Sequence, residues 1–210
     1  MSIKHTSTQR EYARLAPNYD VRWSTYVEAT TRETMKRLHL KPGQRLLDVG
    51  CGTGFLLEKV ISTFPDTHIA GMDPSPEMLG MARGKCLNGI DFMEGWAESL
   101  PFRDDSFDVV VSCNAFHYWR QPAMALDEIA RVLKPEGRLL ITDWCGDHLA
   151  CRICDLYLRA FNRAHFRTYG AKECEALIAT AGFHDIGVER YKISWLWGMM
   201  TVTAKGRVCR

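Results

Sequence analysis

Short apolar runs alternate with amphipathic stretches through the middle of the chain. Runs typical of buried strands occupy residues 45–49, 68–72, 90–93, 107–112 and 138–142. Stretches with helical periodicity or helix-start residues lie between them, at residues 55–62, 76–83 and 122–133. Because parallel strands need a crossover connection, which is usually a helix, this alternation predicts a doubly wound, mostly parallel sheet with helices on both faces.

The carboxyl-terminal part breaks this alternation. Residues 172–181 are expected to form a helix that stops at Gly182, and two strand patterns follow at residues 184–194 and 195–205. Two strands joined by a short connection pair antiparallel. The sequence therefore predicts an α/β fold with a seven-stranded sheet in which one antiparallel strand lies near the edge.

Two segments fall outside the strand–helix pattern. Residues 1–40 have helical character, and residues 147–167 carry many apolar and aromatic side chains. Both are placed to cover the carboxyl ends of the strands, where open α/β sheets bind ligands. We expect a single domain over residues 1–210, with residues 1–40 as a helical cover and residues 147–167 as a helical substrate cap.

Composition and charge narrow the class of function. The formal net charge is +2 and no basic block stands out, which argues against nucleic acid as the main partner. No uninterrupted apolar segment approaches the roughly 18–20 residues of a membrane span, and the amino end is polar. These features predict a cytoplasmic protein without a transmembrane segment.

The chain has eight cysteines, and without a secretory signal we expect them to be reduced. One C-x-x-C pair, Cys151 and Cys154, has two interpretations. The two residues are either buried neighbours on one helix face or part of a zinc site completed by other cysteines and histidines between residues 145 and 174. We favour the buried pair and expect no metal.

The strand pattern at residues 45–49 leads into a glycine-rich turn, Gly50-Cys51-Gly52-Thr53-Gly54. Glycine tolerates positive φ and has no Cβ, so backbone there can come close to a ligand. A second acid, Asp73, ends the next apolar run, where a carboxylate can bind ribose hydroxyls. Together the turn and Asp73 indicate a cofactor that contains a nucleoside.

Several segments then carry a resemblance to a known family, in the right order along the chain. They are residues 12–20, 46–54, 71–79, 95–102 with 107–110, and 131–138. In these segments the chain resembles class I S-adenosylmethionine-dependent methyltransferases of the small-molecule type-11 group, which includes quinone-ring C-methyltransferases. The resemblance implies a Rossmann-like fold and S-adenosylmethionine as the cofactor.

The resemblance also implies the cofactor contacts. The backbone of Gly50, Cys51 and Gly52 would approach the methionine portion, and Asp48 would brace this loop or bind the cofactor's amino end. Asp73 would accept hydrogen bonds from both ribose hydroxyls. The other implied contacts are Tyr19 in the amino-terminal cover, Pro74 and Met78 at the adenine, Trp96 and Ala97 in the adenine loop, and the backbone of Asn114.

Trp96 departs from the family pattern, which usually has an aspartate at this position to accept from the adenine amino group. The adenine contact here must therefore come from backbone, or the Trp96 ring stacks on the adenine or points away from it.

The residues that follow the strand at 107–112 would face both the sulfonium and the substrate. His117 is the candidate general base because imidazole titrates near neutral pH; the alternative is a structural histidine. The predicted substrate-binding residues are Tyr12, Tyr118, Trp119, Trp144 and Arg167. Their mostly aromatic character favours a small-molecule substrate with an aromatic or lipophilic part.

Other functions stay open at this point. A nicotinamide-dependent oxidoreductase is disfavoured because the loop is G-x-G-x-G and not G-x-G-x-x-G. A non-catalytic S-adenosylmethionine-binding subunit would keep the same loop. Among methyltransferases, carbon, oxygen and nitrogen acceptors all fit, and the cysteines leave room for a thiol-dependent arsenic methylase. We expect a methyltransferase acting on a small molecule, as a monomer or homodimer.

Overall fold

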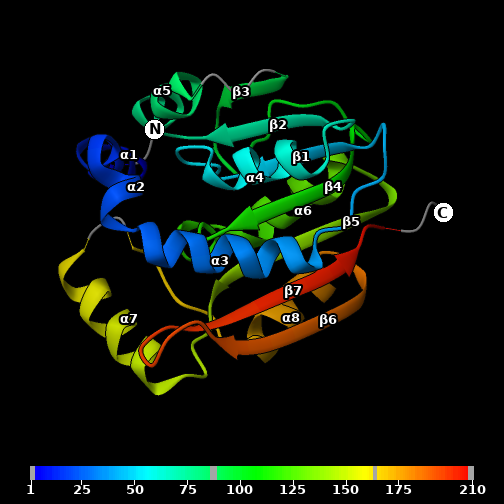
Figure 1. Ribbon diagram of the computed structural model, residues 1–210. Coiled ribbons are helices and arrows are strands. Elements are labelled where there is room, and N and C mark those ends of the chain that lie inside the picture. The colour runs from blue at the N-terminus through cyan, green and yellow to red at the C-terminus, as the bar shows by residue number, and fades with distance from the viewer. Residues whose placement is uncertain (1–2, 86–88, 163–164, 208–210) are drawn as a thin grey trace.

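The computed structural model describes residues 3–85, 89–162 and 165–207. Its centre is a seven-stranded sheet in the order β3-β2-β1-β4-β5-β7-β6 (Figure 1). The strands are β1 (Arg45–Val49), β2 (His68–Asp73), β3 (Ile90–Glu94), β4 (Phe107–Cys113), β5 (Leu133–Trp144), β6 (His184–Lys192) and β7 (Gly198–Lys205). The helices are α1 (Ile3–Leu15), α2 (Tyr19–Arg22), α3 (Ser24–Arg37), α4 (Phe55–Thr63), α5 (Pro76–Gly84), α6 (Pro122–Val132), α7 (Leu149–Phe161) and α8 (Ala171–Thr180), with 3₁₀ turns η1 (Ala16–Asn18) and η2 (Phe116–Tyr118).

The strand directions match the prediction. Parallel pairing joins β3, β2, β1, β4 and β5, and β7 runs antiparallel to both of its neighbours. The α/β fold with one antiparallel strand near the edge is therefore confirmed. The order of the strands reverses between β1 and β4, and ligands bind outside the carboxyl ends of strands at such a switch point.

Strand β5 begins earlier than the sequence predicts. It starts at Leu133, directly after α6, and its register with β4 shifts between the pairs made by Phe107 and Val109. Glu136 has a φ of 59°. Residues 134–137, which the sequence places between a helix ending at 133 and a strand starting at 138, are therefore an irregular part of a longer strand, of the kind that a bulge produces.

The reversed strand β7 brings a turn to the ligand-binding edge of the sheet. Trp144, at the carboxyl end of β5, pairs with Met199 at the start of β7. Residues 193–197 were expected to belong to strands, but they form the β6–β7 turn, in which the Ile193 N–H donates to the Trp197 carbonyl at 3.1 Å. This turn lies at the same edge as the carboxyl ends of the parallel strands (Figure 1).

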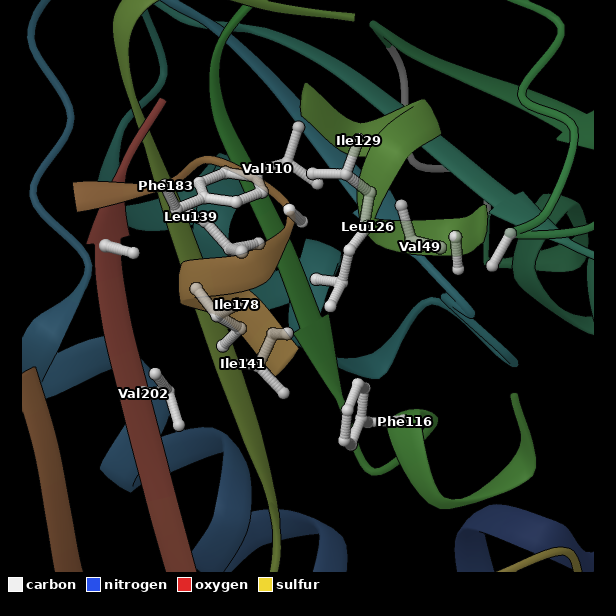
Figure 2. Packing of buried hydrophobic residues seen from close by; sticks show 14 of the residues in the cluster. Val49, Val110, Phe116, Leu126, Ile129, Leu139, Ile141, Ile178, Phe183 and Val202 are labelled. Carbon is white, nitrogen blue, oxygen red and sulfur yellow. The ribbon is translucent and has the colours of Figure 1, made fainter. Parts of the chain in front are cut away.

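Helices cover both faces of the sheet, as predicted. On one face, Leu126 and Ile129 of α6 and Ile178 of α8 pack against strand residues such as Val110 and Leu139 (Figure 2). A second hydrophobic cluster, on the other face of the sheet, contains buried residues of α4, α5, β1 and β2. This two-sided core holds the strand ends rigidly, so the loops that follow them have fixed positions.

Helix α7 accounts for most of the segment that we expected to form a cap. Its buried residues are Cys151 and Asp155, whereas most of its large apolar side chains are exposed. Across the described part of the chain, no helix combines the length and hydropathy needed to cross a membrane.

Candidate functional site

One cavity lies at the carboxyl ends of β1, β2 and β4; its empty space, counted together with the open solvent at its mouth, is about 1020 Å³. All of the predicted cofactor contacts line it: Tyr19, Asp48, Gly50, Cys51, Gly52, Asp73, Pro74, Met78, Trp96, Ala97 and Asn114. The predicted substrate residues Tyr12, Tyr118 and Trp119 also line it. His117, Trp144 and Arg167 are not among its lining residues.

The glycine turn holds its shape through backbone hydrogen bonds to β2. The N–H groups of Gly50 and Cys51 both donate to the Met72 carbonyl, at 2.8 and 3.0 Å. Gly50 has a φ of +83°, and a Cβ there would lie 2.4 Å from the Ala115 Cβ. Gly52 has a φ of +54°, and a Cβ there would meet nothing within 4 Å, so its backbone faces open space into which a ligand can fit.

Asp73 connects the glycine turn to the start of α5. Its Oδ2 accepts from the Gly52 N–H and its Oδ1 from the Ser75 N–H, both at 2.9 Å. Burial raises the pKa of Asp73 to about 6, although these two hydrogen bonds lower it. Each carboxylate oxygen has a second lone pair, so Asp73 can still accept from two hydroxyls.

Asp48 is the second buried acid of the cavity. Its side chain is fully enclosed, and its Oδ1 has no hydrogen-bond partner. Burial, together with the charge of Asp73, raises the pKa of Asp48 to about 8. A buried acceptor without a partner costs free energy, and an ammonium group placed beside it would remove that cost. These two acceptors therefore fit S-adenosylmethionine, which carries donors of both kinds: ribose hydroxyls and an ammonium group.

Asn114 uses its side chain to attach helix α3 to the end of β4. Its Oδ1 accepts from the Tyr26 hydroxyl at 2.7 Å, and its Nδ2 donates to Thr30 Oγ1 at 2.8 Å. Asn114 has a φ of 61°, in the left-handed region. Because its side-chain amide is occupied in this way and its backbone N–H donates to the Thr142 carbonyl at 2.9 Å, its backbone carbonyl is the group left to face a cofactor.

The amino-terminal cover lies over the glycine turn and contacts it directly. Gln9 donates to the Pro74 carbonyl at 2.7 Å, and Thr53 Oγ1 donates to Asp20 at 2.6 Å. The rings of Tyr12 and Tyr118 meet edge to face, with centroids 5.4 Å apart. Burial raises the pKa of both phenols, that of Tyr118 to about 12, so they are neutral and act by packing.

Trp96 lies in the loop after β3, next to Ala97, and both line the cavity. Its carbonyl accepts from the Ser99 N–H at 3.0 Å, which closes a tight turn. An indole cannot accept a hydrogen bond from an adenine amino group as a carboxylate does. The substitution therefore leaves backbone contact or stacking as the ways in which this loop can meet an adenine.

His117 is buried beside the cavity and is held by Asp143, a residue that the sequence analysis missed. Its Nδ1 lies 2.6 Å from Asp143 Oδ1, and its backbone N–H donates to Asp143 Oδ2 at 3.0 Å. Because a carboxylate only accepts, the Nδ1 carries the proton of this hydrogen bond. Asp143 lies at the end of β5 as Asp73 lies at the end of β2, and that position was the available signal.

A second histidine–aspartate pair lies close to the first. His165 Nε2 is 2.8 Å from Asp155 Oδ1, and the ring centroids of His165 and His117 are 5.5 Å apart. Trp144 stacks on His117 at 4.9 Å and donates from its indole nitrogen to the Tyr26 hydroxyl. Trp197, from the β6–β7 turn, packs on Trp144 with centroids 4.7 Å apart. We call His117, Tyr118, Trp144, His165 and Trp197 the aromatic cluster.

Arg167, predicted to bind substrate, pairs with Glu173 at 2.5 Å on a half-exposed surface.

Of the C-x-x-C pair, Cys151 is buried and Cys154 partly exposed. Within residues 3–85, 89–162 and 165–207, no group of three histidines, cysteines or acids could hold a metal ion. Six cysteines are described and all are free thiols; Cys86 and Cys209 lie outside the described residues.

Comparisons with known proteins agree with the predicted fold and family. A family model described as "Methyltransferase domain" matches residues 47–141. The chain is 30% identical over 164 residues to 2-methyl-6-phytyl-1,4-hydroquinone methyltransferase 1 of Oryza sativa subsp. japonica, covering 75% of this chain and 46% of that protein. It is also 30% identical over 174 residues to phosphoethanolamine N-methyltransferase of Triticum aestivum, covering 76% of this chain and 32% of that protein. The chain thus spans less than half the length of these relatives.

The fold also matches solved structures. In the complex of the Haloferax volcanii Trm112 methyltransferase activator with a putative methyltransferase, the similarity has a TM-score of 0.83 at 22% identity and covers 94% of this chain and 98% of that chain. None of these comparisons supports a nicotinamide-dependent oxidoreductase. The strand order, the buried acids and the relatives agree with the sequence prediction, and the chain belongs to the class I S-adenosylmethionine-dependent methyltransferases of the type-11 group.

Proposed function

We propose that this chain transfers the methyl group of S-adenosylmethionine to a small molecule with an aromatic or lipophilic part. The observation that carries the proposal is the pair of buried acids on one cavity. Asp48 has an unpaired Oδ1, and Asp73 has spare lone pairs beside the glycine turn. When bound, the cofactor supplies an electrophilic methyl group on its sulfonium.

The side chains of the cavity have separate tasks in this proposal. Asp73 would hold the ribose and Asp48 would pair with the ammonium end. Tyr12, Tyr19 and Tyr118 form part of the cavity wall and would exclude water. Alignment of donor and acceptor, together with exclusion of water, is the main contribution that a protein makes to an in-line displacement of this kind.

The aromatic cluster supports an aromatic acceptor. Its rings lie directly beyond Tyr118, which belongs to both the cluster and the cavity wall. The described residues that line the cavity include a single basic side chain, Arg120, so a strongly anionic acceptor would meet little positive charge. Relatives named for a phytyl hydroquinone and for phosphoethanolamine support a small-molecule acceptor in general.

His117 would act as the base that removes a proton from the acceptor. Asp143 holds Nδ1 and so orients the ring, and Nε2 is the nitrogen that would accept the proton. His117 lies behind Tyr118, so the acceptor reaches it only when the aromatic cluster opens.

For the whole protein we keep a cytoplasmic location, which the six free thiols support, and a monomeric or homodimeric state.

Two measurements test the proposal. Calorimetric titration should show binding of S-adenosylmethionine and no binding of NADH; the reverse result would restore the oxidoreductase alternative. Incubation with methyl-labelled cofactor and separate pools of hydroquinones, phenols and amines should label an aromatic acceptor. Binding of the cofactor without label in any pool or in a cell extract would favour a non-catalytic binding subunit instead.

A further inference from the structure

Helix α7 turns its apolar side chains away from the protein. Five large apolar residues, between 60% and 76% exposed, lie along it: Leu149, Ile153, Leu156, Tyr157 and Phe161. Their spacing follows the helical period, so they form one continuous face, which we call the α7 apolar face. A helix that packs on a protein core buries such a face, whereas α7 exposes it.

Buried polar contacts hold α7 in this orientation. Asp155, on the opposite side of the helix, accepts from the Thr168 N–H at 2.7 Å and lies 2.8 Å from His165 Nε2. Cys151 Sγ donates to the Gly198 carbonyl at 3.2 Å. Rotating the apolar face inward would break these contacts. The exposure is therefore a fixed property of the fold.

The charges beside the apolar face all have one sign. Arg152 and Arg159 are the exposed ionisable residues of α7, and both lie along one border of the apolar face. The acid of the helix, Asp155, is buried and paired with His165, and its other oxygen is 3.7 Å from Arg159. Trp195, which is 86% exposed, projects from the β6–β7 turn that leads to Gly198 beside α7.

We propose that the α7 apolar face docks on an anionic lipid surface. A basic border, an apolar face and aromatic side chains are the features of helices that lie in the membrane interface. With 13 residues, α7 is about 20 Å long, which suits lying in the plane and is too short to span. A second copy of the chain fits less well, because a two-fold contact would bring the arginines together without an exposed acid on the helix.

The test is sedimentation of the full chain with vesicles, without cofactor or acceptor. One set is phosphatidylcholine alone, and the other is equal parts phosphatidylcholine and phosphatidylglycerol. The protein should bind the anionic vesicles, and added salt should weaken binding. Ile153→Ser with Phe161→Ser should weaken it at least about tenfold, and each of Arg152→Gln and Arg159→Gln about fivefold.

The matched control is Met124→Ser, which removes a half-exposed apolar side chain from α6 and should bind vesicles as the unmodified protein does. Thermal unfolding of each variant should match, since all the substituted side chains are exposed. The proposal is overturned if the unmodified protein binds neither vesicle or if the Ile153/Phe161 variant binds equally well. A dimer that the same substitutions dissociate, without vesicle binding, would assign the face to a second copy. Because no methyl transfer is measured, failure here leaves the proposed function standing, and the reverse also holds.

Discussion

The two halves of the ligand-binding edge are built differently. On the cofactor side, strand ends and a glycine turn present Asp48 and Asp73 to an open cavity. On the side proposed for the acceptor, η2, the end of β5 and the β6–β7 turn bring their aromatic side chains into contact with one another. The cofactor half is preformed by backbone, whereas the acceptor half is filled by its own side chains.

This difference indicates the order of events at the site. Backbone groups that are already placed bind a cofactor without rearrangement, and so they cost little conformational entropy. Rings that pack on each other must separate before another ring can enter between them. We therefore expect cofactor affinity and acceptor turnover to respond to different residues, and three substitutions test that separation.

The largest effect should come from His117→Ala. If His117 is the base, turnover should fall roughly 10²–10⁴-fold. Cofactor affinity, measured by calorimetry, should stay unchanged because His117 does not line the cavity. His184→Ala, which removes a half-buried histidine on β6, is the matched control and should leave turnover near that of the unmodified protein. Turnover within severalfold for His117→Ala would limit this residue to packing.

Asp73→Ala should change the cofactor affinity, which His117→Ala leaves unchanged. Loss of two charged hydrogen bonds to ribose should weaken cofactor binding by about 1.5–3 kcal/mol, which is roughly 10–150-fold in Kd. Asp91→Ala, at an exposed position on β3, is the control and should leave Kd unchanged. An unaltered Kd for Asp73→Ala would remove this residue from the cofactor site.

The smallest effect concerns pH. Burial and the charge of Asp73 raise the pKa of Asp48 to about 8, so the cofactor-free protein holds a proton there at pH 6. Pairing with an ammonium group requires the ionised form, so binding releases that proton. Affinity should therefore rise with pH, by about tenfold or more between pH 6 and pH 8. Calorimetry in buffers of different ionisation enthalpy measures the release directly.

Asp48→Asn is the matched variant for this pH effect. It keeps the shape of the side chain but removes the titrating group, so proton release on binding should fall and the affinity should become flatter between pH 6 and pH 8. Equal proton release by Asp48→Asn and the unmodified protein would assign the titration to Asp73, whose pKa burial raises to about 6.

The cofactor half could be predicted from the sequence because each of its parts is local. An apolar run that ends in an acid, followed by glycines, specifies a strand, a turn and a ligand contact within a few residues. That is why Asp48, Gly50, Gly52 and Asp73 all line the cavity. The parallel part of the sheet follows from the same alternation of runs, and the antiparallel strand follows from the break in that alternation near the carboxyl end.

The acceptor half depends on contacts between residues distant in the sequence. Asp143 lies 26 residues from His117, and nothing in the local pattern pairs them. Trp197 was assigned to a strand, because the apolar residues of a short turn resemble the start of a strand, and its contact with Trp144 was missed. The orientation of α7 depends on the buried Asp155, and a periodic apolar pattern does not say which way such a helix faces.

The reversal of β7 allows the methyl acceptor to change in evolution while the methyl-donor site stays the same. Because β7 runs antiparallel to β5, the hairpin turn at residues 193–197 reaches the acceptor side of the sheet, far along the chain from the glycine turn. Changing the length of a hairpin turn costs only tenths of a kcal/mol in loop-closure entropy, on the order of (3/2)RT times the logarithm of the length ratio. Descendants of this chain could therefore exchange one methyl acceptor for another by lengthening or shortening that hairpin, while the donor site is inherited intact.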